Sequence, residues 1–188
     1  MLFCEAMKKI VTIHQPSFCP YHGFFQKMEQ ADTIVILTEC QFEKNGYQNR
    51  FNHENKWYTM RINQSLRPIK DKLYLEPIED WRKITTAFPK LDRLNVSIQP
   101  RLDAMNSSII RSAAQILGIR TEIQYDFPTK LTSTARLVEI CKHHNATHYL
   151  SGISGRNYMD LKLFEDAQID VVFQDENTLS KKSLIQIL

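Results

Sequence analysis

Apolar runs and amphipathic stretches alternate along the chain. Residues 10–13 and 33–37 are β-branched runs typical of buried strands, and apolar residues at helical spacing begin near Gly23 between them. Pro16 and Pro20 keep the loop after the first run out of a helix. A strand, a loop, a helix and a second strand in this order predict a βαβ unit with parallel strands and a right-handed crossover.

The same alternation continues toward the C-terminus. Further strands are expected at 57–62, 121–125, 147–150 and 169–173, and helices at 80–88, 100–118, 133–144 and 159–167. We expect a hairpin loop at 52–56, a cap at Asp80, and a surface loop or small insertion at 63–75. These elements predict a single α/β domain over 1–188, in which helices flank a layered, mainly parallel sheet.

Composition and charge narrow the class of protein. Of 188 residues, 43% are hydrophobic and 24% charged, which is typical of a globular fold. The charge of +3 is spread, apart from the pair at 181–182, so we expect no nucleic-acid partner. Widely spaced cysteines and the lack of a long apolar segment predict a cytoplasmic protein with reduced thiols, no metal site and no membrane span. Residues 1–6 are interpreted as extra sequence before a start at Met7.

The first polar cluster follows the first predicted strand, at residues 14–23. His14 is the catalytic candidate, because an imidazole can transfer a proton or donate to an anion. Helix N-termini offer free N–H groups to phosphate or carboxylate, so a helix beginning at Gly23 indicates an anion site. We predict substrate contacts from Gln15, Tyr21, His22 and Gly23. The alternative is that His14 only ends the strand and that His22 is a solvated loop residue.

The second polar cluster, residues 39–50, follows the second predicted strand. Glu39 is a candidate general base, and Arg50 could pair with a carboxylate or phosphate in bidentate fashion. Gln41 and Asn49 are predicted to orient a substrate. The alternative is a polar turn with Arg50 in an ordinary ion pair.

A third cluster, Ser151-Gly152-Ile153-Ser154-Gly155-Arg156, lies between a predicted strand and a predicted helix. Its glycines and serines are compatible with an anion-cradling loop, to which Arg156 would add charge. We predict substrate contacts from Ser151, Gly152, Ser154, Gly155 and Arg156. A tight strand-to-helix turn explains the same residues without a ligand.

The three clusters together resemble the WbqC-like family of bacterial surface polysaccharide loci. The resemblance is carried by IHQPSFCPYHGFFQKMEQAD (13–32), CQFEKNGYQNR (40–50) and the segment 133–175, in family order. It implies a role in making O-antigen or other surface glycans. Family members differ at Thr38, Glu39 and Cys40, where they have an acidic residue and Val, and their tails beyond the QD pair (174–175) are longer.

A more distant similarity is to the HIGH-type nucleotidyltransferase folds, although the second His of their motif is absent after His22-Gly23. The leading hypothesis is an acyl or aminoacyl transferase, or a nucleotide-dependent amide-forming enzyme, that acts on a sugar or sugar nucleotide. The alternative is a non-catalytic ligand-binding or scaffold protein of a glycan assembly complex, associated with glycan biosynthesis enzymes. The sequence leaves any cofactor open.

Overall fold

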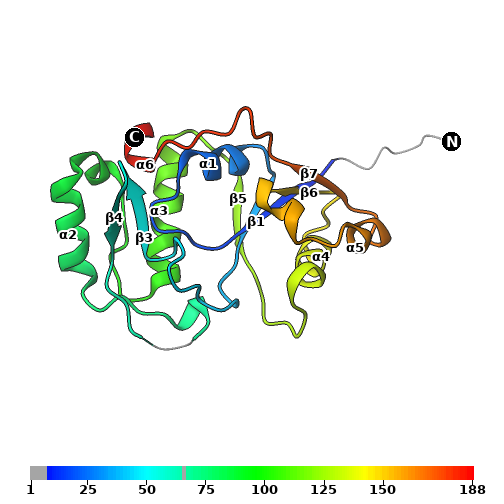
Figure 1. Cartoon of the computed structure of the whole chain (residues 1–188), viewed down its shortest axis with the longest axis horizontal. Helices are drawn as coiled ribbons and strands as arrows, with labels where there is room; N and C mark the ends of the chain where they lie inside the picture. The colour runs from blue at the N-terminus through cyan, green and yellow to red at the C-terminus, as the bar shows by residue number, and fades with distance from the viewer. Residues whose placement is uncertain (1–7, 65–66) are drawn as a thin grey trace.

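The computed structural model describes residues 8–64 and 67–188, so the interpretation of residues 1–6 lies outside the described residues. Within them, five strands form one parallel sheet in the order β5-β2-β1-β6-β7 (Figure 1). These strands are β1 (Ile10–His14), β2 (Thr33–Ile36), β5 (Glu122–Tyr125), β6 (His148–Ser151) and β7 (Asp170–Phe173). The prediction of an α/β fold with a mainly parallel sheet is confirmed.

The order of the strands reverses direction at the centre of the sheet. From β1 the chain passes outward through β2 to β5, and it then returns to the other side of β1 to form β6 and β7. In parallel α/β sheets, ligands bind beyond the carboxyl ends of the strands at such a reversal. The carboxyl ends of β1 and β6, at His14 and Ser151, are therefore the first place to look for a site.

Helices cover both faces of this sheet because its strands alternate in the direction of their side chains. Ile34 and Ile36 of β2 pack with α1 (His22–Glu29) and α3 (Leu102–Ile116). Val35 packs on the other face with α4 (Ser133–His143) and α5 (Leu161–Asp166). Across residues 8–64 and 67–188, no helix has the length and apolar character needed to cross a bilayer.

A second group of elements packs against the α1–α3 side of the sheet. It consists of the hairpin β3 (Arg50–His53) and β4 (Lys56–Thr59), the helix α2 (Pro77–Ala87) and the 3-10 turns η1 (Ile69–Asp71) and η2 (Pro89–Arg93). The hairpin loop is shorter than predicted, because Glu54 and Asn55 both adopt positive φ angles (50° and 62°) and close a two-residue turn. This turn places Arg50 on a strand rather than in a loop.

One local prediction about this region needs correction, and another remains a prediction. Within the predicted surface loop or small insertion at 63–75, Ile69 and Tyr74 are 0% and 2% exposed and belong to the main core. Asp80 lies within α2 rather than capping it, and its carboxylate accepts hydrogen bonds from the backbone N–H and the guanidinium of Arg61. Gly118 ends α3 with a φ of 74°, as expected of a helix C-terminal glycine.

The last part of the chain returns across the molecule. After β7, residues 175–183 run along α1 and lead into the short helix α6 (Leu184–Ile187), whose Leu184 is buried in the main core (Figure 1). We call residues 175–183 the C-terminal strap. It contains a turn in which the N–H of Thr178 donates to the carbonyl of Asp175, and it ends at Ser183, which forms a capping box with Gln186 of α6. The hydrophobic pattern of the sequence gave no indication of the strap.

Candidate functional site

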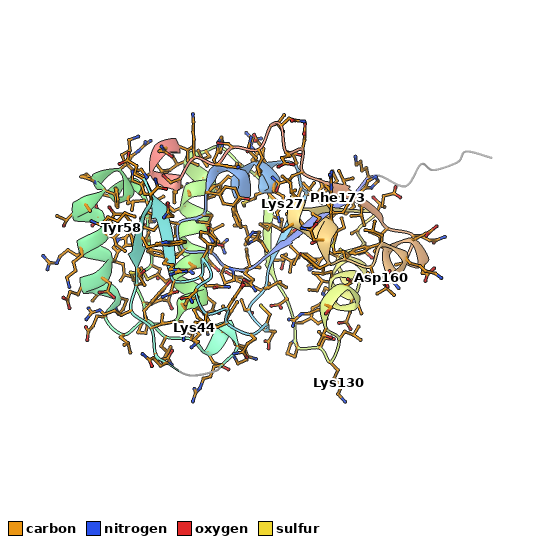
Figure 2. All side chains as sticks on the ribbon, in the orientation of Figure 1. Lys27, Lys44, Tyr58, Lys130, Asp160 and Phe173 are labelled. Atoms are coloured by element: carbon orange, nitrogen blue, oxygen red, sulfur yellow. The ribbon has the colours of Figure 1, made fainter. Side chains whose placement is uncertain are left out.

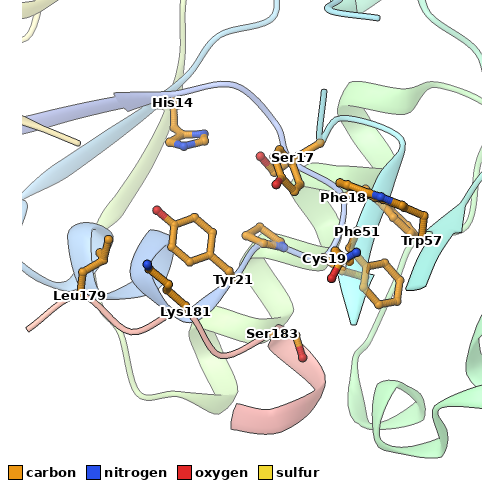
Figure 3. Close-up of a pocket in the computed structure, with 13 residues that line it drawn as sticks. His14, Ser17, Phe18, Cys19, Tyr21, Phe51, Trp57, Leu179, Lys181 and Ser183 are labelled. Carbon is orange, nitrogen blue, oxygen red and sulfur yellow. The ribbon is translucent and has the colours of Figure 1, made fainter. Parts of the chain in front are cut away.

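A cavity of about 560 Å³ opens at the carboxyl end of β1 (Figure 3). One wall is the loop that follows β1, with His14 and residues 17–21. The second wall comes from the hairpin region, with Tyr47, Phe51, Asn52 and Trp57. The third wall is the C-terminal strap, with Leu179, Lys181 and Ser183. Segments far apart in sequence thus enclose one space at the predicted edge of the sheet.

His14 lines this cavity in a fixed orientation. Its Nδ1 atom lies 2.9 Å from the carbonyl oxygen of Gln15, and its ring meets the ring of Phe24 edge to face with centroids 4.9 Å apart. A carbonyl oxygen only accepts hydrogen bonds, so Nδ1 carries the proton and Nε2 carries the lone pair. Burial, and then the charge of Lys27, lower the pKa of His14 to about 3. The imidazole is therefore neutral at physiological pH and can accept a hydrogen bond from a ligand.

Lys27, whose charge acts on His14, is a residue of α1 (Figure 2). Its side chain is 4% exposed, and its Nζ donates a 3.2 Å hydrogen bond to the carbonyl oxygen of Ile13. Burial lowers the pKa of Lys27 to about 7, since an ammonium group loses hydration in the interior. A partly deprotonated lysine thus supports the strand end that carries His14.

The N-terminus of α1 is occupied by the protein itself. The backbone N–H of His22 donates to the carbonyl of Lys182 at 2.8 Å, and that of Gly23 donates to the carbonyl of Ser180 at 3.0 Å. A Cβ on Gly23 would lie 2.6 Å from Cδ1 of Leu179 and 3.1 Å from the Ser180 oxygen. The carbonyls of the strap therefore accept hydrogen bonds from the N–H groups that were predicted to bind an anion. The lack of a side chain at Gly23 allows the strap to pack closely against the start of α1.

Gln15 connects the first two polar clusters. Its amide oxygen accepts a hydrogen bond from the side chain of Gln48, and its amide nitrogen lies 3.7 Å from the sulfur of Cys40. Burial, followed by the charge of Asp126, raises the pKa of Cys40, so the thiol is not an activated nucleophile. The side-chain oxygen of Gln48 is buried without a partner among the described residues.

Glu39 and Gln41 point to other structural partners. The carboxylate of Glu39 pairs with Lys70 at 2.6 Å, and its backbone N–H donates to Asp126 at 3.2 Å. Asp126 in turn forms a buried ion pair with Arg136. Gln41 is exposed and forms an isolated β-bridge with Pro68. Neither residue lines the cavity, and their predicted roles remain predictions.

Asn49 and Arg50 also act within the hairpin region. The Asn49 amide donates to the carbonyl of Met60 at 2.9 Å. Arg50 donates to the carbonyls of Asn45 and Gly46, and its guanidinium lies 4.1 Å from the ring centroid of Trp57. Arg50 thus reaches the cavity only indirectly, through the position it gives Trp57.

The third cluster lies at the same edge of the sheet, but it is folded into a 3-10 turn, η3 (Ile153–Asn157). Parallel pairing of Thr12 with Leu150 places the carboxyl ends of β1 and β6 at the same edge of the sheet. The hydroxyl of Ser151 donates to the carbonyl of Gly152, and the N–H of Gly155 is used within the turn. A Cβ on Gly155 would lie 2.2 Å from the Ser151 hydroxyl, so this glycine is explained by packing.

The other two polar side chains of this cluster, Ser154 and Arg156, are exposed. Ser154 faces solvent, and Arg156 lies over the ring of Phe173 with 4.9 Å between its guanidinium carbon and the ring centroid. None of the six residues of the cluster lines the cavity. Their predicted contacts with a substrate remain predictions.

Of the predicted site residues, His14 and Tyr21 line the cavity, whereas its other polar and aromatic side chains were not predicted. Tyr47 and Trp57 are the main aromatic residues that the sequence analysis missed, and Lys181 is the main charged one. Burial, followed by the charge of Tyr47, raises the pKa of Tyr21, so its phenol stays protonated and can donate. Among the residues that line the cavity, Lys181 is the one Lys or Arg, and none is Asp or Glu.

In the part of the chain that the structure describes, no group of three or more His, Cys, Asp or Glu side chains is placed so that it could hold a metal ion. The chemistry that the cavity offers is that of a neutral imidazole, a phenol, a lysine and several aromatic rings.

One family model matches most of the chain. The model of the WbqC-like protein family matches residues 15–87 and 82–181, which include residues of all three walls of the cavity but neither His14 nor Ser183. A protein of Mycobacterium tuberculosis (strain ATCC 25618 / H37Rv), named Uncharacterized protein Rv1507c, is 23% identical over 200 residues. That alignment covers 90% of this chain and 83% of the mycobacterial protein. No solved structure matches the chain.

Proposed function

Because this chain belongs to the WbqC-like protein family, we propose that it is an enzyme that binds a small molecule in the cavity beside His14. The substrate class is a sugar or a sugar nucleotide of bacterial surface polysaccharide biosynthesis. The reaction is the transfer of an acyl or aminoacyl group to an amine, which forms an amide. The proposal also includes association with other enzymes of glycan assembly in the cytoplasm.

The observation that carries this proposal is the state of His14. Its ring lines the cavity, Nδ1 is used by the Gln15 carbonyl, and Nε2 has no partner among the described residues. A neutral imidazole accepts a hydrogen bond from an amine, and this bond orients the lone pair of the amine toward an acyl carbon.

In the proposed reaction, the substrate amine attacks the carbonyl carbon of an activated acyl group. A C–N bond forms, the bond from that carbon to its leaving group breaks, and the amine loses one proton. His14 receives this proton at Nε2 and passes it to the leaving group, since a pKa of about 3 makes the imidazolium short-lived. Tyr21 is the phenol in the cavity lining that can donate to the developing oxyanion.

A non-catalytic ligand-binding protein is the second candidate. The observation that favours it is the same low pKa, because an imidazole that protonates only near pH 3 is a weak general base. In this case His14 would orient the ligand without changing it.

The test begins with a thermal-shift screen of nucleotides and sugar nucleotides, because a bound ligand raises the melting temperature by mass action. Each ligand that binds is then incubated with acyl-coenzyme A donors, or with amino acids and ATP, and the products are measured by mass spectrometry. An acylated product that His14→Asn fails to form supports the enzyme. Binding without any product supports the second candidate, and the lack of binding by every compound removes both.

A further inference from the structure

The hairpin wall of the cavity presents aromatic rings to solvent. Tyr47 is 58% exposed and Trp57 is 42% exposed, and their ring centroids are 5.5 Å apart at an interplanar angle of 47°. Arg50 holds Trp57 by its cation–π contact and is itself bound to two carbonyls of the preceding loop. Solvated rings held in place beside a cavity are a surface on which a nucleobase can stack.

The strap wall presents a positive charge that is equally well positioned. Lys181 lies between Ser180 and Lys182, whose carbonyls accept the first N–H groups of α1. The backbone N–H of Ser180 is fixed as well, by a 2.8 Å hydrogen bond to the side chain of Gln26. The ammonium group of Lys181 has no hydrogen bond or ion pair with another described residue, although its backbone is held on both sides.

This arrangement replaces the anion site predicted from the sequence. The strap blocks the N–H groups at the start of α1 with its carbonyls, and in the same three residues it brings a lysine into the cavity. Figure 3 shows Lys181 and Tyr21 at the same end of the cavity, with Trp57 at the other. A cavity of about 560 Å³ has the size of a typical small-ligand site, and its one formal charge is positive.

We propose that Lys181 and the Tyr47–Trp57 pair form the subsite for a nucleoside phosphate, with the base on the rings and the phosphate on Lys181. This proposal rests on the proposed function and specifies which part of a sugar nucleotide each wall binds. The phenol of Tyr21 donates to the phosphate beside Lys181. The reacting sugar then extends toward His14.

The test is isothermal titration calorimetry of the full chain with uridine, thymidine, guanosine, adenosine and cytidine 5′-diphosphates. The corresponding nucleosides and inorganic pyrophosphate are the comparison ligands. We expect at least one diphosphate to bind, and its nucleoside to bind at least about tenfold more weakly, because a charged hydrogen-bonded contact is lost. This affinity should fall as the salt concentration rises.

Lys181→Met is the diagnostic variant, and Lys182→Met is its matched control. Lys182 is the neighbouring lysine of the strap, and its side chain does not line the cavity. We expect Lys181→Met to weaken the diphosphate to the affinity of its nucleoside, while Lys182→Met keeps the affinity of the unmodified chain. Lys181→Gln serves as a second variant if Lys181→Met does not fold. Trp57→Leu should weaken diphosphate and nucleoside alike and leave pyrophosphate unchanged.

Equal binding by Lys181→Met and by the unmodified chain would overturn this assignment, as would the failure of every diphosphate to bind. The proposed function has a different point of failure. If a diphosphate binds through Lys181 but no sugar nucleotide is ever acylated, the nucleoside phosphate subsite is supported and the proposed enzymatic activity is refuted. If acylation proceeds unchanged in Lys181→Met, the enzymatic activity is supported and the subsite is refuted.

Discussion

The Nδ1 atom of His14 and the carbonyl oxygen of Gln15 lie 2.9 Å apart, and this contact decides which ring nitrogen faces a ligand. The carbonyl can only accept, so the proton stays on Nδ1 and the lone pair stays on Nε2. Burial and the nearby Lys27 lower the pKa of His14 to about 3, which keeps the ring neutral. A neutral acceptor suits an uncharged amine or hydroxyl better than it suits an anion.

The first prediction is that His14→Asn loses activity without losing the fold. The asparagine amide can still donate to the Gln15 carbonyl, but it has no equivalent of Nε2. Product formation should fall about 100-fold or more, which is the usual contribution of a group that handles a proton. The melting temperature should fall only slightly, because the edge-to-face contact with Phe24 contributes about 0.5–1.5 kcal/mol.

The pH profile provides a second measurement on His14. A folded-state pKa near 3 predicts activity without an inflection from this group between pH 5 and 8. An inflection near pH 6.5 that disappears in His14→Asn would contradict the assigned state of the ring. Normal turnover by His14→Asn would exclude the imidazole from the chemistry.

The sheet edge that carries His14 could be predicted because its signals are local. The β-branched run at 10–13 and the helical spacing after Gly23 indicate β1 and α1 directly. Parallel strands place their carboxyl ends at one edge, so the ends of β1 and β6 lie at the same edge although 138 residues separate the paired segments. The position of these strand ends follows from topology alone.

The other two walls of the cavity were not predictable from the same signals. Tyr47 precedes β3 and Trp57 lies on β4. The sequence predicted a hairpin with its loop at 52–56, but the residues of the short polar strand β3 alternate too little to place its start at Arg50. Lys181 lies in the strap, which has no hydrophobic period and is fixed by backbone hydrogen bonds to α1. Such contacts join residues about 160 positions apart and depend on carbonyl groups, which every residue has.

The second prediction concerns Arg50, which the sequence indicated as a catalytic residue. Its bonds to the carbonyls of Asn45 and Gly46 and its contact with Trp57 indicate a structural contribution. Arg50→Ala should lower the free energy of unfolding by about 1–2 kcal/mol, since two backbone carbonyls lose the part-exposed, charged guanidinium that donates to them. Limited proteolysis should then cut the loop at 43–47 faster than in the unmodified chain.

Arg156→Ala is the matched control for Arg50→Ala. Arg156 also lies over an aromatic ring, that of Phe173, but it is exposed and donates no hydrogen bond to a described side chain or carbonyl. Its replacement should change stability by no more than about 0.5 kcal/mol. Arg50→Lys should not restore stability, because an ammonium group lacks the planar fork that reaches two carbonyls. Equal effects of both alanine variants would refute the structural role of Arg50.

The third prediction is that Lys27 makes stability rise with pH above neutrality. The folded pKa of about 7 lies below the ordinary lysine value of 10.5, so the unfolded chain binds more protons between these two values. Burial of the charged Lys27 therefore lowers the free energy of unfolding by its full amount below pH 7. This destabilisation decreases as the pH rises from 7 toward 10.5. In denaturant titrations at pH 7 and pH 9.5, the unmodified chain should gain stability relative to Lys27→Met. The slope for one proton is at most about 1.4 kcal/mol per pH unit. A difference that does not change with pH would show that Lys27 is charged or solvated in the folded state.

The fourth prediction compares two glycines at the same edge of the sheet. A Cβ on Gly23 would lie 2.4 Å from the Tyr21 ring and 3.1 Å from the backbone oxygen of Ser180, so the strap must move to admit it. On Gly152 the nearest atom would be 3.8 Å away, and the backbone there (φ −67°, ψ 162°) is open to any residue. We expect Gly23→Ala to cost about 1–3 kcal/mol through overpacking, in spite of the better helix propensity of alanine.

Gly152→Ala should change stability by no more than about 0.5–1 kcal/mol in either direction. Hydrogen exchange distinguishes a displaced strap from a general loss of stability. In Gly23→Ala the amides of His22 and Gly23 should exchange faster, because their acceptors are the carbonyls of Lys182 and Ser180. Amides of β1 should exchange at an unchanged rate relative to global unfolding.

Because the strap also carries Lys181, Gly23→Ala should weaken diphosphate binding while Gly152→Ala does not. If Gly23→Ala leaves both the exchange at the start of α1 and the binding unchanged, the strap is not held by these contacts.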